Sequence, residues 1–269
     1  MATIEAVGAT AEVNGARLAY DDTGGDGPVV LLSHGFLMDR RMFDDQVAAL
    51  RHDYRVITWD ARGWGETLYD GRPFTYWDLA RDCLALMDHL GIDRAVVGGM
   101  SQGGFLALRA ALLAPGRIRG LILLDSQAGP EDPDVVPVYQ GMIDAWVIDG
   151  PSDELADACA ALILGEPGLS ATWTARWKAL PQESVRNPGQ ALVEREGIED
   201  RLGEITAPAL VVHGTADLSI SMDKAERMAD GLVGCTGVVA IEEGTHAANM
   251  THPGPVNAAI VEFLAGLPD

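Results

Sequence analysis

The pentapeptide Gly99-Met100-Ser101-Gln102-Gly103 joins two apolar stretches, residues 95–100 and 102–114. The first stretch has the length and composition of a buried strand, and the second predicts a helix. A G-x-S-x-G motif in this context forms a sharp turn that lifts the serine hydroxyl clear of the edge of a sheet. In such a turn, the residues two before and two after the serine come too close together to carry a Cβ atom. The motif therefore predicts that Ser101 is a nucleophile with a strained backbone.

Strands and helices alternate on both sides of this motif. A hairpin is predicted at Asn14-Gly15, and beyond it apolar runs predict strands while amphipathic spacing predicts helices. The strands are expected at 29–34, 55–60, 95–100, 120–125, 209–213 and 238–241, and the helices at 41–52, 76–90, 102–114, 222–232 and 253–264. This order is typical of right-handed β-α-β units, so the predicted fold class is α/β with a parallel sheet and helices on both faces.

Residues 127–204 interrupt the alternation with helical patches, many prolines and no strong strand. The simplest interpretation is one α/β core, residues 1–126 and 205–269, that carries a helical cap at 127–204. An insertion that leaves the carboxyl end of a strand lies above the edge where α/β proteins bind their ligands.

Acidic side chains dominate the charge: 40 Asp and Glu against 19 Lys and Arg give a formal net charge of −21. Such a surface repels phosphate backbones and anionic lipids, so we expect no nucleic acid and no membrane as partners. The cysteines Cys83, Cys159 and Cys235 are too scattered for a disulfide framework or a zinc site. Residues 1–10 lack the features of a signal peptide, and no apolar run is long enough for a membrane span. We therefore expect a cytoplasmic protein that acts on a small molecule, and the sequence leaves a homodimer open.

Two further motifs complete a resemblance to the α/β-hydrolases that extends over nearly the whole chain. The segment 33–36 (SHGF) follows the first buried strand and resembles the H-G-x segment of that family, and residues 60–65 (DARGWG) resemble its D-x-R-G-x-G turn. The resemblance implies a mostly parallel eight-stranded sheet with a helical lid. It also implies an oxyanion hole in which the backbone N–H of Phe36 is one donor, and it suggests that Asp60 and Arg62 form a stabilising pair. The other donor is the N–H of Gln102, because it begins a helix directly after the nucleophile.

The rest of a catalytic triad is expected later in the chain, in the order acid, then histidine. Asp217 follows the strand at 209–213, and His246 follows the last strand. These are the loops in which α/β-hydrolases carry their acid and their histidine. Imidazole takes the proton of the serine hydroxyl, while the carboxylate fixes the ring tautomer and stabilises its charged form. We therefore predict the triad Ser101, Asp217 and His246.

Two alternatives stay open for this triad. Asp125 ends the strand after the nucleophile's strand, a position from which some α/β-hydrolases supply the acid. His252 is a second candidate for the base, but it precedes Pro253 at a helix start, where a capping or surface role is expected.

A serine nucleophile favours acyl transfer to water, with no cofactor and no metal. Met100, Met142, Ile143 and Trp146 are predicted to line the substrate pocket. Because few basic side chains lie near the motifs, the expected substrate is a small to medium, largely neutral carboxylic ester or lactone. The motifs are also similar to those of 3-oxoadipate enol-lactonases and cofactor-free haloperoxidases (perhydrolases), which leaves those activities as alternatives. A non-catalytic receptor is a further hypothesis, since fold alone does not determine function.

Overall fold

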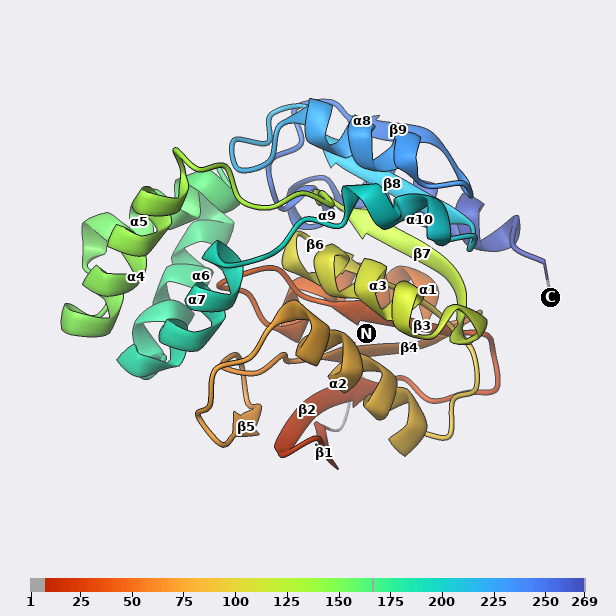
Figure 1. Ribbon diagram of the computed structural model, residues 1–269, viewed down its shortest axis with the longest axis horizontal. Helices are drawn as coiled ribbons and strands as arrows, with labels where there is room; N and C mark the ends of the chain where they lie inside the picture. Colours follow the sequence, from red (N-terminus) through yellow and green to blue (C-terminus); the bar gives the residue numbers. More distant parts are fainter. Residues whose placement is uncertain (1–7, 166, 269) are drawn as a thin grey trace.

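One sheet runs through the molecule, and the computed structural model in Figure 1 describes residues 8–165 and 167–268. The strand order is β1-β2-β4-β3-β6-β7-β8-β9, and the short strand β5 pairs with β2. In chain order the strands are β1 (Ala9–Val13), β2 (Ala16–Asp22), β3 (Val29–Ser33), β4 (Arg55–Trp59), β5 (Leu68–Tyr69), β6 (Ala95–Met100), β7 (Ile118–Leu124), β8 (Ala209–Gly214) and β9 (Cys235–Ile241).

Among the described residues, one α-helix lies between each parallel strand and the next along the chain, from β3 to β9, except between β7 and β8, where four lie. The α-helices are α1 (Asp44–Leu50), α2 (Tyr76–His89), α3 (Gln102–Leu113), α4 (Val136–Asp149), α5 (Asp153–Ile163), α6 (Pro167–Ala179), α7 (Arg186–Val193), α8 (Met222–Gly231), α9 (Ala248–Thr251) and α10 (Pro253–Ala265). Short 3-10 turns lie at η1 (Arg40–Phe43), η2 (Pro115–Arg117), η3 (Gln182–Val185) and η4 (Glu199–Glu204).

The predicted fold class is confirmed. The strands β4, β3, β6, β7, β8 and β9 pair in parallel, and the β1–β2 hairpin joins them antiparallel through β2. Asn14 and Gly15 connect the hairpin at φ 47° and 77°, as a type I′ turn requires. The two-residue strand β5 was not predicted, because two residues are too few for an alternating pattern.

Helices cover the sheet on both faces. Helices α2 and α3 lie side by side on one face, and α1 and α10 lie together on the other (Figure 1). Every residue of the central strand β6 is buried, as its continuous apolar run predicts for a strand covered on both sides.

The segment between β7 and β8 forms helices α4, α5, α6 and α7, which gather at one end of the sheet (Figure 1). The carboxyl ends of the parallel strands point toward this group. Trp146 of α4 is completely buried, so the group has its own apolar interior. We keep residues 127–204 as the proposed boundaries of this cap.

The signal-peptide prediction concerns residues 1–10, and residues 1–7 of them lie outside the described part of the chain. None of the helices within residues 8–165 and 167–268 is both long and apolar enough to cross a membrane.

The turn at residues 60–65 is structural, but Asp60 and Arg62 do not pair with each other, so that prediction was wrong. Asp60 accepts a hydrogen bond from the N–H of Arg40 at 2.8 Å and pairs with the Arg40 guanidinium. Arg62 pairs instead with buried Asp82 of α2, with 2.6 Å between Nε and Oδ2. The reason lies in Gly65: a Cβ there would lie 2.1 Å from Oδ2 of Asp60, so the turn closes over that carboxylate while Arg62 extends toward α2.

Strained backbone collects at the carboxyl edge of the sheet. Leu37, Ser101, Asp125 and Glu243 have φ values of 64°, 52°, 46° and 57°, and they follow β3, β6, β7 and β9. A non-glycine residue in this region costs about 1–3 kcal/mol, and such residues cluster at functional sites. The backbone conformation alone therefore indicates a functional site at this edge.

Candidate active site

Ser101 occupies the turn between β6 and α3, with φ 52° and ψ −113°. Its N–H donates to the carbonyl oxygen of Leu124 at 2.9 Å, and its own carbonyl accepts from the hydroxyl of Ser126 at 2.9 Å. These bonds to the neighbouring strand and its loop hold an unfavourable conformation in place. The predicted strained strand-to-helix turn is confirmed.

The glycines of the motif are required by the space beneath the turn. A Cβ at Gly103 would lie 1.8 Å from the carbonyl oxygen of Ser33, and one at Gly99 would lie 2.1 Å from the same oxygen. Both distances are far below van der Waals contact, and the obstructing atom is backbone that cannot rotate away.

Gly103→Ala is therefore expected to lower the free energy of unfolding by about 3 kcal/mol, the upper end of the usual overpacking range. Gly116→Ala is the matched control, because no atom lies within 4 Å of a Cβ at that exposed position. Its effect is expected to stay within about 1 kcal/mol. Urea unfolding of both variants measures the difference, and equal stabilities would contradict the turn geometry.

Asp217 and His246 come from the loops after β8 and β9, and the structure brings their side chains together. Oδ2 of Asp217 lies 2.8 Å from Nδ1 of His246. Oδ1 of Asp217 accepts hydrogen bonds from the N–H groups of Ser219 and Ile220 at 2.7 and 3.0 Å. Because both carboxylate oxygens are engaged, Asp217 holds one orientation of the imidazole ring. The other ring nitrogen, Nε2, then remains available to accept a proton.

The charge state of Asp217 suits this arrangement. Burial acts to raise the pKa of Asp217, but the charge and hydrogen bond of His246, together with the N–H of Ile220, outweigh burial and hold the pKa below its ordinary value. The carboxylate is therefore ionised at neutral pH, as stabilisation of an imidazolium requires.

Asp125, the alternative acid, has different partners. It accepts hydrogen bonds from the N–H groups of Gly214 and Ala248, at 2.8 and 3.2 Å, and no bond joins it to His246 within the described residues. Burial, and next the negative charge of Asp217, raise the pKa of Asp125 well above its ordinary value. Asp125 thus ties the loop that carries Asp217 to the helix that follows His246. The geometry favours Asp217 as the acid.

His252, the alternative base, lies apart from these contacts. Its Nδ1 is 3.0 Å from Oγ1 of Thr251, and its side chain does not cap helix α10. The geometry favours His246 as the base.

Asp125, His213 and Asp217 place potential metal ligands within 4.8 Å of one another. Nε2 of His213 lies 2.8 Å from the carbonyl oxygen of Ile220, so this nitrogen carries the ring proton and cannot bind a cation. Burial lowers the pKa of His213, which keeps the ring neutral. The two carboxylates are occupied by hydrogen bonds as well. We therefore interpret this cluster as groups that hold Asp217 in position and not as a metal site.

The peptide group between Gly35 and Phe36 is oriented by His34 beneath it. The carbonyl oxygen of Gly35 lies 2.7 Å from Nδ1 of His34, and Nε2 of His34 accepts the N–H of Ala61 at 3.0 Å. The ring is therefore neutral, with its proton on Nδ1, in agreement with the effect of burial, which lowers its pKa. In a trans peptide the C=O and N–H point in opposite directions, so the Phe36 N–H points away from His34. Within residues 8–165 and 167–268 this N–H has no acceptor.

The N–H of Gln102 begins helix α3 and likewise has no acceptor in the described part of the protein. The Gln102 side chain is buried in the core, where its Oε1 accepts the hydroxyl of Tyr76 at 3.2 Å. Only its backbone is thus available to a ligand. Two unpaired N–H groups on neighbouring loops are what an oxyanion hole requires, and we keep Phe36 and Gln102 as the proposed donors.

Ser101 and His246 line the same cavity, whose volume of about 40 Å³ is equivalent to roughly three water-sized spheres. The cavity lies between the sheet edge and the cap. Because its volume is small, a short acyl group is the size that fits. Most of its wall is apolar and consists of Phe36, Leu37, Phe105, Met142, Cys159, Leu162, Ile163, Leu192 and Ile220.

Of the four predicted pocket residues, Met142 lines this cavity and the other three do not, which corrects the prediction. Met100 is buried beneath the loop after β3 that carries Phe36, which we call the oxyanion loop. A Cβ on Gly35 of this loop would come within 2.4 Å of the Met100 sulfur. Ile143 packs against Gly189 of α7, and Trp146 is fully buried. The side chains of α4 divide between the cavity and the interior of the cap, and the sequence pattern does not distinguish the two.

The residues near the cavity that the sequence analysis missed include Glu131, Tyr139 and Arg195. Glu131 and Tyr139 line the cavity, and Nη1 of Arg195 lies 3.3 Å from Oε2 of Glu131. The guanidinium of Arg195 stacks at 4.1 Å over the ring of Phe105, which is itself a wall residue. A charged residue in a helical insertion is usually exposed, so the sequence held no signal for this group.

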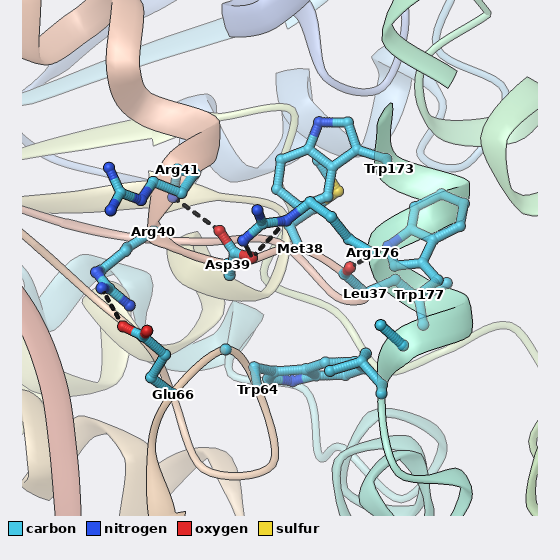
Figure 2. Close-up of a pocket in the computed structure, with 13 residues that line it drawn as sticks. Leu37, Met38, Asp39, Arg40, Arg41, Trp64, Glu66, Trp173, Arg176 and Trp177 are labelled. Atoms are coloured by element: carbon cyan, nitrogen blue, oxygen red, sulfur yellow. Dashed lines mark hydrogen bonds and ion pairs between the residues drawn. The ribbon is translucent and has the colours of Figure 1, made fainter. Parts of the chain in front are cut away.

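A larger cavity, about 320 Å³, lies on the other side of the oxyanion loop, between that loop and α6 (Figure 2). The indoles of Trp64, Trp173 and Trp177 line it, and Leu37 lines both cavities. Neither Ser101 nor His246 lines the larger cavity, so we assign the chemistry to the smaller one.

Helix α6 contacts the oxyanion loop on the side of the larger cavity and holds it in place. Nε1 of Trp177 donates to the carbonyl oxygen of Leu37, and Arg176 pairs with Asp39 (Figure 2). Leu37 has the strained φ of 64°, so the cap helps to fix the backbone next to Phe36.

Comparison with known proteins supports the fold described above. The sequence profile of the family described as alpha/beta hydrolase fold matches residues 28–253. A thermophilic esterase from Thermogutta terrifontis superposes with a TM-score of 0.86 at 30% identity, covering 96% of this chain and 97% of the esterase. The enol-lactonase from Burkholderia xenovorans LB400 superposes with a TM-score of 0.86 at 28% identity, covering 95% and 99%. A protein of Caulobacter sp. (strain K31), whose name marks it as a candidate carbamate hydrolase (RutD), is 31% identical over 253 residues, covering 90% of this chain and 92% of that protein.

Proposed function

The chain belongs to the alpha/beta hydrolase fold family, and on that premise we propose that it is a serine hydrolase that cleaves a small, largely neutral carboxylic ester or lactone through an acyl-enzyme. The observation that carries this proposal is the 2.8 Å bond between Asp217 and Nδ1 of His246, a residue that lines the same cavity as Ser101.

In the proposed reaction, Nε2 of His246 takes the proton of Ser101 as Oγ attacks the substrate carbonyl carbon. The carbonyl oxygen becomes an oxyanion, which the N–H groups of Phe36 and Gln102 stabilise. The C–O bond to the alcohol then breaks, and His246 returns the proton to the departing oxygen. Water repeats the sequence on the acyl-enzyme and releases the carboxylic acid.

The same steps open a lactone ring, where the departing alcohol stays attached to the acyl group. Carbamate hydrolysis is the second candidate. It is favoured by the carboxylate of Glu131 in the cavity wall, which can accept a hydrogen bond from a carbamate N–H.

The test is hydrolysis of p-nitrophenyl acetate and p-nitrophenyl butyrate, together with labelling by a fluorophosphonate. We expect both esters to be cleaved, with the acetate preferred because the cavity is small. We also expect one fluorophosphonate adduct per chain, located on Ser101 by peptide mass. A protein that neither cleaves these esters nor reacts with the fluorophosphonate would contradict the proposal and favour the receptor hypothesis.

A further inference from the structure

The cavity of the proposed active site contains a carboxylate with unused hydrogen-bonding capacity. The Glu131 side chain is 7% exposed and lines the cavity. Its Oε2 has Nη1 of Arg195 at 3.3 Å, and its Oε1 has the N–H of Asp132 at 3.3 Å. Both distances are longer than the usual range for N–H···O bonds, and an ionised carboxylate has about four acceptor sites. Glu131 can therefore accept further hydrogen bonds from a ligand in the cavity.

Tyr139 adds a second polar group to the same wall. Within residues 8–165 and 167–268 its hydroxyl has no hydrogen-bond partner, although the residue lies in the cavity lining beside Met142. Burial, and next the charge of Glu131, raise the pKa of Tyr139 to about 12, so the phenol stays protonated. It can both donate to a ligand and accept from one.

Arg195 determines the net charge of this part of the cavity wall. It is 5% exposed, its Nε donates to the carbonyl oxygen of Gly129 at 2.9 Å, and its buried Nη2 has no partner in the described part of the chain. A buried carboxylate needs a compensating charge, and Arg195 supplies one next to Glu131. The pair of Glu131 and Arg195 has no net charge, so no cationic ligand is required to compensate Glu131.

We infer that the acyl group of the substrate carries an uncharged hydrogen-bond donor, a hydroxyl or an N–H, which Glu131 accepts and Tyr139 orients. This inference rests on the proposed hydrolase function of the site. An alkyl group in the same place would leave the Tyr139 hydroxyl without a partner and Glu131 with only its two long hydrogen bonds. Enzymes discriminate strongly against apolar analogues when polar groups of the site lose their partners. Glu131 and Tyr139 are then residues that determine specificity.

The test compares ester pairs of equal shape that differ in a donor. The pairs are ethyl lactate with ethyl isobutyrate, ethyl 3-hydroxybutyrate with ethyl 3-methylbutyrate, and ethyl carbamate with ethyl acetate. Initial rates are followed by the release of ethanol, which every one of these substrates yields in equal amount. Each kcat/KM ratio is divided by the ratio of the hydroxide-catalysed rates, which removes intrinsic reactivity. We expect a normalised preference of about 10-fold or more for the donor in at least one pair, as for a hydrogen bond to a charged group. The pair that shows it identifies a hydroxyl or an N–H as the donor.

Two variants link the preference to these residues. Glu131→Gln weakens the acceptor, and Tyr139→Phe removes the hydroxyl without disturbing Arg195, so each should reduce the normalised ratio several-fold. Glu154→Gln, on the exposed face of cap helix α5, is the matched control and should keep the ratio of the unaltered protein. If Glu131→Gln does not fold, Tyr139→Phe alone decides.

Hydrolysis of the esters with no normalised preference above about fivefold in any pair would overturn the inference and leave the proposed function standing. A preference that persists unchanged in both variants would overturn the assignment to Glu131 and Tyr139. Failure to hydrolyse any ester, with no fluorophosphonate adduct on Ser101, would instead contradict the proposed function.

Discussion

Ser101→Ala is expected to lower kcat for p-nitrophenyl acetate by about 10⁴-fold or more, because the acyl-enzyme needs a nucleophile that no neighbouring group can replace. Burst and steady-state kinetics measure the loss. The residual rate should still exceed the uncatalysed rate, because the backbone N–H groups of Phe36 and Gln102 are untouched by the substitution.

Fluorophosphonate labelling separates a lost nucleophile from a distorted site. The adduct should disappear in Ser101→Ala and persist in Ser219→Ala, the variant of the second serine that lines the cavity. Thermal unfolding should show a folded protein in both cases. An adduct that survives in Ser101→Ala would place the nucleophile elsewhere.

The strand-to-helix turn at Ser101 and the fold were predictable because the constraints on them are local. A turn that lifts Ser101 out of the sheet excludes a Cβ at Gly99 and Gly103, and both glycines stand in the sequence at fixed distances from the serine. The buried parallel strands appear as continuous apolar runs for an equally local reason. Asp217 and His246 lie 29 residues apart. Their positions after successive strands, together with the resemblance to the α/β-hydrolases, predicted that they meet.

The cavity wall could not be predicted in this way. Glu131 and Arg195 are 64 residues apart and pair only because the start and the end of the cap return to the same place. The ion pair of Arg62 could not be predicted either, because its partner Asp82 lies on α2. The predicted partner, Asp60, is enclosed by Gly65. Ion pairs of this kind depend on how elements pack, and no spacing rule within one element encodes them.

Asp217→Asn is expected to lower kcat by about 10³- to 10⁴-fold, since an amide favours the wrong tautomer of the base. The N–H groups of Ser219 and Ile220 both donate to Oδ1 of Asp217. The oxygen of the introduced amide must occupy that position, which turns its NH₂ group toward Nδ1 of His246. The ring then carries its proton on Nε2 and cannot accept the proton of Ser101.

Asp125→Asn is the matched control for Asp217→Asn, because the two carboxylates are neighbours with different partners. Its NH₂ group would face the N–H of either Gly214 or Ala248, so we expect a loss of about 1–3 kcal/mol in stability and a much smaller loss in kcat than for Asp217→Asn. A loss of kcat in Asp125→Asn as large as that in Asp217→Asn would contradict the assignment of the acid.

The pH dependence of stability should separate the two positions by sign. The pKa of Asp217 is lowered in the folded state, so its contribution is present above the ordinary Asp value of about 3.9 and is lost as the pH falls through the folded value. The pKa of Asp125 is raised, so its contribution is present below about 3.9 and is lost as the pH rises through the folded value. Urea unfolding from pH 3 to pH 8 should therefore show the advantage of the unaltered protein over Asp217→Asn growing with pH. Its advantage over Asp125→Asn should shrink over the same range, and slopes of the same sign would mean that one of the two carboxyl groups has been assigned the wrong charge state.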